Sequence, residues 1–140
     1  MYLAAAVREW VRPVPEMSIY HMEKEGASLG DFRRRLMEYR PDVVGFSTLT
    51  AEAPGLDACL RVTREVLPKS FTVVGGPHAT IFHDYVLKKP EVDAVVLGEG
   101  ELTFAELTDR LQSGRDWRDV HGIVYRGGDR PVSNPSREPL

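Results

Sequence analysis

The sequence is poor in cysteine: Cys59 is the only one among 140 residues. One cysteine cannot form an internal disulfide, and it cannot supply the several thiolates of a zinc or iron–sulfur site. This composition favours a cytoplasmic protein. Cys59 lies in a stretch with helical character, where a buried small hydrophobic side chain is more common than a reactive thiol. We therefore expect Cys59 to lie in the core.

Long apolar runs and clusters of positive charge are also absent. No run approaches the roughly 20 apolar residues that a membrane span needs, so no membrane partner is expected. Residues 1–10 lack the basic segment that precedes the apolar part of a signal peptide, and they indicate an amphipathic helix instead. The formal net charge of −3 comes without a basic stripe, which argues against a nucleic-acid partner. The length and the 42% hydrophobic content are typical of one globular domain.

Three short apolar runs follow one another along the chain, at residues 42–46, 71–75 and 93–97. Continuous apolar runs without alternation are typical of strands that are buried on both faces. Segments long enough for helices separate the runs, and this alternation favours a parallel sheet built from βαβ units. The sequence thus predicts an α/β fold, a flavodoxin- or Rossmann-like parallel sheet with flanking helices.

Helix signals lie between these runs. Ser28 and Asp31 have a capping-box-like spacing and predict a helix over residues 28–39. A second helix is expected over residues 54–67, and a third over residues 101–113. The apolar face of the second should carry Leu56, Leu60, Thr63 and Leu67.

The ends of the chain carry weaker signals. Residues 17–22 interleave β-branched and aromatic side chains and predict a further strand. Residues 122–126 and 130–133 flank a glycine-rich turn, which predicts a C-terminal β-hairpin. We expect an α/β domain over residues 1–120, and a hairpin followed by an extended linker over residues 121–140.

Ligands of an open parallel sheet bind beyond the carboxyl ends of its strands, so the informative residues should follow the three runs. These candidate binding residues are Ser47, Thr48, Leu49, Thr50, Gly75, Gly76, Pro77, His78, Gly98, Glu99 and Gly100. The hydroxyls could bind a polar ligand or cap the next helix. The glycine pair could admit a large group or form a tight turn. Together the loops predict a shallow, mostly neutral cleft.

The same residues do not describe a catalytic centre. The sequence contains no phosphate-binding glycine–lysine loop, no regularly spaced set of metal ligands and no paired nucleophile and base. Glu101 is explained by the helix dipole, whereas Glu99 has no packing role between two glycines. Of the histidines His21, His78, His83 and His121, only His78 is expected near a ligand. We therefore predict no catalytic residue and no metal ligand.

Residues 41–50, 73–80 and 95–101 resemble the N-terminal B12-binding domains of B12-dependent radical-SAM enzymes, and the nearest group is the anaerobic magnesium-protoporphyrin IX monomethyl ester cyclases. The resemblance covers residues 1–135. It implies cobalamin, with its cobalt ion, as the cofactor. It further implies that Ser47, Leu49 and Thr50 lie along the nucleotide tail with Gly75 and Gly76 against it, and that the loops of His78 and Glu99 lie nearer the corrin ring.

Two departures from that family limit what this chain can do. The three-cysteine cluster is absent, so an iron–sulfur cluster and S-adenosylmethionine would belong to a radical-SAM domain or partner chain that is missing here. The first strand of the family, which would lie mid-sheet, is missing as well, and so is the cobalt-ligating histidine motif that would follow it. Either the natural chain begins upstream, or the domain is split or decayed.

Three hypotheses follow. The first is a cobalamin-binding module of a radical-SAM-type enzyme that is non-catalytic on its own. The second is a cofactor-free structural or docking domain that keeps the B12-binding fold. The third, an independent small enzyme using Glu99 and His78 as acid and base, is disfavoured because neither a nucleophile nor a metal site accompanies them.

Overall fold

Helices and strands alternate through the middle of the chain, as the apolar runs predict. The computed structural model describes residues 2–47 and 53–138. The helices are α1 (Tyr2–Trp10), α2 (Met22–Glu25), α3 (Leu29–Tyr39), α4 (Ala53–Val66), α5 (Pro77–Ile81), α6 (His83–Leu87) and α7 (Glu101–Gln112). The strands are β1 (Val43–Ser47), β2 (Phe71–Gly75), β3 (Ala94–Val96), β4 (Ile123–Gly127) and β5 (Arg130–Ser133).

The described strands form one sheet in the order β1-β2-β3-β4-β5. β1, β2 and β3 are parallel, whereas β4 pairs antiparallel with β3 and β5 pairs antiparallel with β4. The predicted α/β fold and the predicted hairpin are therefore confirmed. The hairpin extends the sheet on the β3 side, so the whole is a mixed sheet with flanking helices.

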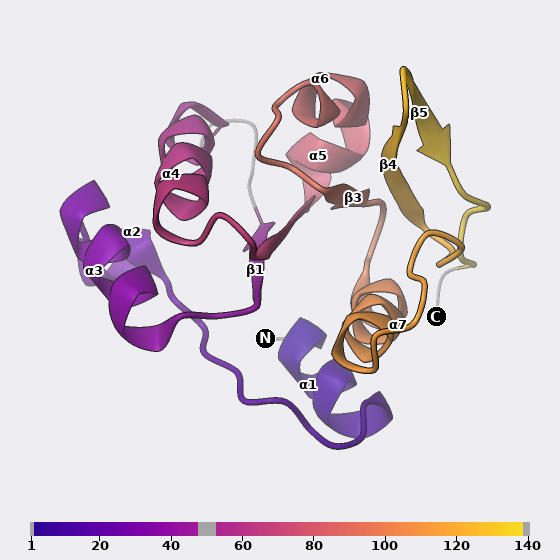
Figure 1. Cartoon of the computed structure of the whole chain (residues 1–140), viewed down its shortest axis with the longest axis horizontal. Coiled ribbons are helices and arrows are strands. Elements are labelled where there is room, and N and C mark those ends of the chain that lie inside the picture. Colours follow the sequence, from indigo (N-terminus) through magenta and orange to yellow (C-terminus); the bar gives the residue numbers. More distant parts are fainter. Residues whose placement is uncertain (1, 48–52, 139–140) are drawn as a thin grey trace.

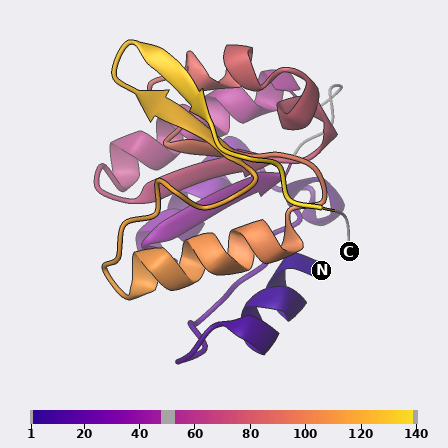
Figure 2. The same cartoon turned by 90° about the vertical axis from the view of Figure 1, so that its right-hand side faces the viewer.

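Alternating side chains of the buried strands supply a core on each face of the sheet. Val74 and Val95 pack with Leu60 of α4 and with apolar residues of α5 and α6. Val73, which precedes Val74 in β2, faces the opposite side of the sheet and packs with Leu107 of α7. Figure 1 and Figure 2 show the resulting layers, with α4, α5 and α6 on one face and α7 with α1 on the other. A strand buried on both faces explains why its sequence is apolar without alternation.

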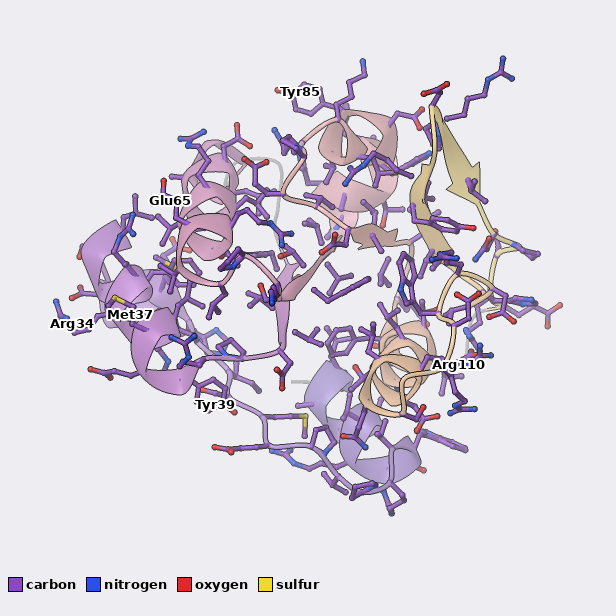
Figure 3. All side chains as sticks on the ribbon, in the orientation of Figure 1. Arg34, Met37, Tyr39, Glu65, Tyr85 and Arg110 are labelled. Carbon is purple, nitrogen blue, oxygen red and sulfur yellow. The ribbon has the colours of Figure 1, made fainter. Side chains whose placement is uncertain are left out.

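The predicted helices form nearly as expected. Ser28 accepts a hydrogen bond from the Asp31 backbone N–H, and the Asp31 carboxylate accepts one from the Ser28 N–H, which completes the capping box of α3. The four residues expected on the buried face of α4 are all buried: Leu56, Leu60, Thr63 and Leu67. On α3 only Phe32 and Leu36 are buried. Arg34 and Met37 project from its outer side (Figure 3).

The strand predicted at residues 17–22 is wrong. The chain there is extended without ladder hydrogen bonds, and α2 begins at Met22. Its aromatic side chain packs on a helix instead: the Tyr20 ring stacks on Phe32 of α3 at a centroid distance of 6.3 Å. Arg35 of α3 also donates to the Ser18 hydroxyl at 2.7 Å. The β-type composition of this segment thus serves helix contacts, because no described strand lies beside it.

No strand precedes α1 in the part of the chain that the structure describes. β1 forms one edge of the sheet, with β2 as its neighbour. α1 packs against α7 rather than against a strand, and it buries Val7 and Val11 beside Ala105. The first strand expected from the resemblance is therefore missing from the described residues, and the sheet is continuous without it.

Cys59 lies on α4, partly buried beside the cluster around Phe32 and Val62. Burial raises the pKa of the Cys59 thiol, so less of it is the reactive thiolate at neutral pH. This agrees with a packing role for Cys59. Within residues 2–47 and 53–138, no helix has the length and apolar character needed to cross a membrane.

Candidate functional site

The carboxyl ends of the three parallel strands lie side by side, and together they form the edge of the sheet where the candidate site is expected. Ser47, the last residue of β1, pairs in register with Gly75, the last residue of β2. Gly98 follows β3 and reaches the same edge, where its backbone N–H contacts Thr80 of α5. The structure thus brings together the start of all three candidate loops. Thr48, Leu49 and Thr50 lie outside the described residues.

The loop after β2 turns directly into a short helix. Gly76 precedes α5 with a φ of 96°, a left-handed conformation that favours glycine, and Pro77 occupies the first turn. Gly75 differs from Gly76. A Cβ added at Gly75 would meet the Val96 carbonyl oxygen at 3.6 Å, which is an ordinary contact. No described protein atom therefore requires glycine at position 75, since a methyl group there would make only ordinary contacts.

His78 is the most unusual polar residue of this edge. Only 6% of it is exposed, and its ring lies 5.1 Å from that of Phe82 between centroids. Neither ring nitrogen has a hydrogen-bond partner among the described residues. A buried polar group without a partner costs free energy, and a bound ligand is one way in which proteins satisfy such a group. The prediction that placed His78 near a ligand thus gains a physical reason.

The loop after β3 has two residues in the left-handed region. Gly98 has a φ of 71° and Gly100 a φ of 81°. A Cβ at Gly100 would lie 2.9 Å from a methyl group of Val96, so packing as well as conformation requires glycine there. The side chain of Glu99 between them is exposed, and Glu101 begins α7. The Glu99 carboxylate therefore lies in solvent near the carboxyl ends of the strands and does not pack against the protein.

A hollow of about 180 Å³ lies beside this loop. Its lining combines the loop with the start of α7 and the C-terminal tail: Leu97, Gly98, Glu99, Gly100, Glu101, Leu102, Thr103, Arg137 and Glu138. Three carboxylates and one guanidinium belong to this set, so this part of the cleft is acidic rather than mostly neutral. The hollow is smaller than the roughly 300–1,000 Å³ of a typical ligand pocket.

A larger hollow of about 320 Å³ lies between α4 and α6, away from the glycine loops. Two of its charged residues pair with each other: the Lys89 ammonium lies 2.6 Å from the Asp57 carboxylate, and it also lies 4.6 Å from the centre of the Tyr85 ring. Tyr85 projects outward from α6 (Figure 3). These contacts account for Lys89, Asp57 and Tyr85 without a ligand.

The other titratable groups do not assemble into a reactive centre. Within residues 2–47 and 53–138, no three His, Cys, Asp or Glu side chains come close enough to hold a metal ion. His21 and His121 are exposed, and His83 lies 3.2 Å from the Thr80 carbonyl oxygen. The described part of the edge thus lacks a nucleophile with its base.

Two contacts that shape this edge could not be predicted from the sequence. The Thr80 hydroxyl joins the glycine loops after β2 and β3. Arg137 donates to the Thr103 hydroxyl at 3.2 Å and pairs with the Glu106 carboxylate at 2.5 Å, which ties the C-terminal tail to α7. Both contacts join residues far apart in the chain, so no local pattern announces them. Thr80 falls within the segment 73–80 that carries the resemblance, and its hydroxyl, four residues after Gly76, was the available signal.

Comparison with known proteins gives a family. The family model described as "B12 binding domain" matches residues 1–108 of this chain. This span includes the three parallel strands and all of the candidate binding residues.

Curated relatives match over most of this chain. An uncharacterized methyltransferase of Pyrococcus horikoshii is 31% identical over 97% of this chain and 29% of its own length. The anaerobic magnesium-protoporphyrin IX monomethyl ester cyclase of Rubrivivax gelatinosus is 34% identical over 77% of this chain and 20% of its own length. The chain therefore spans less than a third of either relative.

Solved structures share the fold. The cobalamin-dependent S-adenosylmethionine radical enzyme OxsB, with aqua-cobalamin and S-adenosylmethionine bound, superposes with a TM-score of 0.82 over 98% of this chain and 19% of the OxsB chain. The two sequences are 18% identical in that alignment, so this likeness concerns the fold.

Proposed function

Because the chain belongs to the B12 binding domain family, we propose that it is the cobalamin-binding module of a radical-SAM-type enzyme and has no catalytic activity on its own. A single cysteine in 140 residues supports the second part, since the chain cannot hold an iron–sulfur cluster by three cysteines. We also propose a cytoplasmic location on the same composition.

The observation that carries the proposal is the imidazole of His78, which is buried and has no hydrogen-bond partner among residues 2–47 and 53–138, and which lies at the edge where the three parallel strands end. A corrinoid is rich in amide groups, which can donate to or accept from an imidazole nitrogen. Gly75 gives a second point of fit, because no described atom requires glycine there and a residue without a Cβ lets a flat or extended group approach the backbone. The described residues therefore fit the cofactor that the family implies.

We propose that Ser47, Leu49 and Thr50 lie along the nucleotide tail, with Gly75 and Gly76 against it. Thr48 and Pro77 would also contact the cofactor. His78 and the loop of Gly98, Glu99 and Gly100 would lie nearer the corrin. When bound, the corrin cobalt would supply methyl-transfer or related ring chemistry. The role of this chain's residues is to hold and orient the cofactor. The hollow beside Glu99 borders the loop that would lie nearer the corrin.

That other domain would be the catalytic one. We propose that residues 121–140 lead from the module of residues 1–120 towards a radical-SAM domain, in the same protein or in a partner chain. The small share of each relative's length that this chain spans supports the proposal. In Figure 2 both termini lie at the right-hand end of the molecule, the end at which α7 begins.

Titration with hydroxocobalamin tests the function. The purified chain is mixed with increasing hydroxocobalamin, desalted, and its absorption spectrum is recorded. We expect retained cobalamin that saturates, with a spectrum that differs from that of the free cofactor. Folded protein that stays colourless would contradict the proposal and would support a cofactor-free docking domain instead.

Replacing His78 with leucine should weaken cobalamin binding without lowering the stability of the fold. Without cobalamin, the free energy of unfolding should stay equal or rise by up to about 3 kcal/mol, because two buried nitrogens without partners among the described residues are removed. The affinity for hydroxocobalamin should fall by roughly two- to tenfold, the value of one hydrogen bond. Urea unfolding and equilibrium dialysis measure the two effects.

The matched control is His21→Leu, which changes an exposed histidine in front of α2. It should alter neither quantity. If the His78 variant binds cobalamin as the wild type does, then His78 does not contact the cofactor. If it unfolds more easily than the wild type, the imidazole has a structural partner.

A further inference from the structure

One side chain joins the two glycine loops of the proposed cofactor edge. Thr80 lies on α5, and its hydroxyl donates to the Gly76 carbonyl oxygen at 3.0 Å. The same hydroxyl oxygen accepts a hydrogen bond from the Gly98 backbone N–H at 3.1 Å. Gly76 follows β2 and Gly98 follows β3, so this hydroxyl spans two loops that come from neighbouring strands.

The loops need such a restraint because both are made of flexible residues. Gly76 and Gly98 both have positive φ, and a glycine has more accessible backbone conformations than any other residue. A Cβ at Gly98 would find no described atom within 4 Å, so packing does not hold that residue in place. The hydrogen bond to Thr80 is therefore a specific restraint on where the loop after β3 begins.

Thr80 is itself held firmly. Its backbone N–H donates to the Gly76 carbonyl oxygen at 3.0 Å, and its own carbonyl oxygen lies 3.2 Å from Nδ1 of His83. The preceding residue, Ala79, is completely buried in the core cluster beneath α5. α5 thus carries the hydroxyl as a fixed point relative to the sheet.

A hydroxyl can donate one hydrogen bond and accept others at the same time. Donation by a helical threonine to the carbonyl four residues earlier is common and by itself implies nothing. Thr63 of α4 does the same with the Cys59 carbonyl oxygen at 2.8 Å. Thr80 differs because its hydroxyl oxygen also accepts a hydrogen bond from the backbone N–H of Gly98, 18 residues further along the chain.

From these contacts we infer that Thr80 is a positioning residue: its hydroxyl sets the spacing between the Gly76 and Gly98 loops, and so the shape of the edge that receives the cofactor. The effect on binding rests on the proposed function. The bridge between the loops does not, because it exists in the protein without a ligand.

Two substitutions test this inference. Thr80→Val keeps the shape of the side chain and removes the hydroxyl, whereas Thr80→Ser keeps the hydroxyl. In the cobalamin-free chain, hydrogen exchange of the Gly98 amide, followed by NMR, should be about fivefold faster in Thr80→Val and near the wild-type rate in Thr80→Ser. The dissociation constant for hydroxocobalamin should rise by about fivefold in the valine variant and be restored in the serine variant.

Thr63→Val is the control, since it removes a helical hydroxyl that touches neither loop. It should leave the Gly98 amide and the cobalamin affinity unchanged. An unchanged Gly98 amide in Thr80→Val would overturn the bridge, and a changed amide with unchanged affinity would overturn its role in binding. A responsive amide in a chain that retains no cobalamin would reject the proposed function and still support the bridge.

Discussion

Gly75→Ala is expected to weaken cobalamin binding by roughly 10- to 100-fold and to leave the fold intact. The added methyl group would make only ordinary contacts with the protein, the nearest at 3.6 Å to the Val96 carbonyl oxygen. A cofactor packed against the Gly75 backbone would instead have to move away from it. Overfilling a packed contact typically costs about 1–3 kcal/mol, and about 1.4 kcal/mol corresponds to a tenfold change in affinity. Equilibrium dialysis against hydroxocobalamin measures the change.

Gly45→Ala is the matched control for that experiment. Gly45 lies in β1, and a Cβ there would also meet its nearest described atoms at 3.6 Å, in Phe104 and Val73. It sits within the strand rather than at its carboxyl end, so its substitution should leave the affinity unchanged. Equal binding by the wild type and by Gly75→Ala would show that no cofactor approaches Gly75.

Gly122→Ala is expected to destabilise the fold by about 2–5 kcal/mol. Gly122 is buried before β4 with a φ of 86°, and a Cβ there would lie 2.6 Å from the Thr103 hydroxyl oxygen. The left-handed conformation costs a non-glycine residue about 1–2 kcal/mol, and overpacking adds about 1–3 kcal/mol. The Thr103 hydroxyl cannot easily withdraw, because it donates to the His121 carbonyl oxygen and accepts from Arg137. Urea unfolding measures the loss.

Gly128→Ala separates the two causes of that loss. Gly128, in the turn between β4 and β5, has a similar φ of 77°, but a Cβ there would find no described atom within 4 Å. Its substitution should cost only the conformational part, about 1–2 kcal/mol. If both variants lose the same stability, the crowding between Gly122 and Thr103 does not matter in solution.

The parallel core of the fold could be predicted because its strands are buried on both faces. Val73 and Val74 face opposite layers and both are almost completely buried, which leaves an apolar run that is legible in the sequence. The buried face of α4 was legible for the same reason, since Leu56, Leu60 and Leu67 recur at helical spacing. In these segments local pattern and tertiary environment agree.

The strand predicted at residues 17–22 failed because a strand needs a neighbour. The same β-branched and aromatic side chains can pack on a helix, and Tyr20 does so against Phe32. Tertiary context decides between the two outcomes, and composition does not encode it.

The candidate site was predictable in its location and only partly in its character. Strand ends followed by glycines marked the edge, and the structure brings Ser47, Gly75 and Gly98 together there. The isolation of the His78 ring nitrogens, the Thr80 bridge and the docking of Arg137 on α7 depend on contacts between distant segments. Contacts between distant segments do not produce a periodic pattern in the sequence.

The central claim, that this chain holds cobalamin at the edge formed by its glycine loops, is tested most directly by a hydrogen-exchange footprint with and without hydroxocobalamin. The account predicts slower hydrogen exchange at residues 75–80 and 98–101. It predicts no change at the β4–β5 turn, which lies near the amino ends of the parallel strands, opposite the glycine loops. Protection confined to other segments, or no protection at saturating cobalamin, would contradict it.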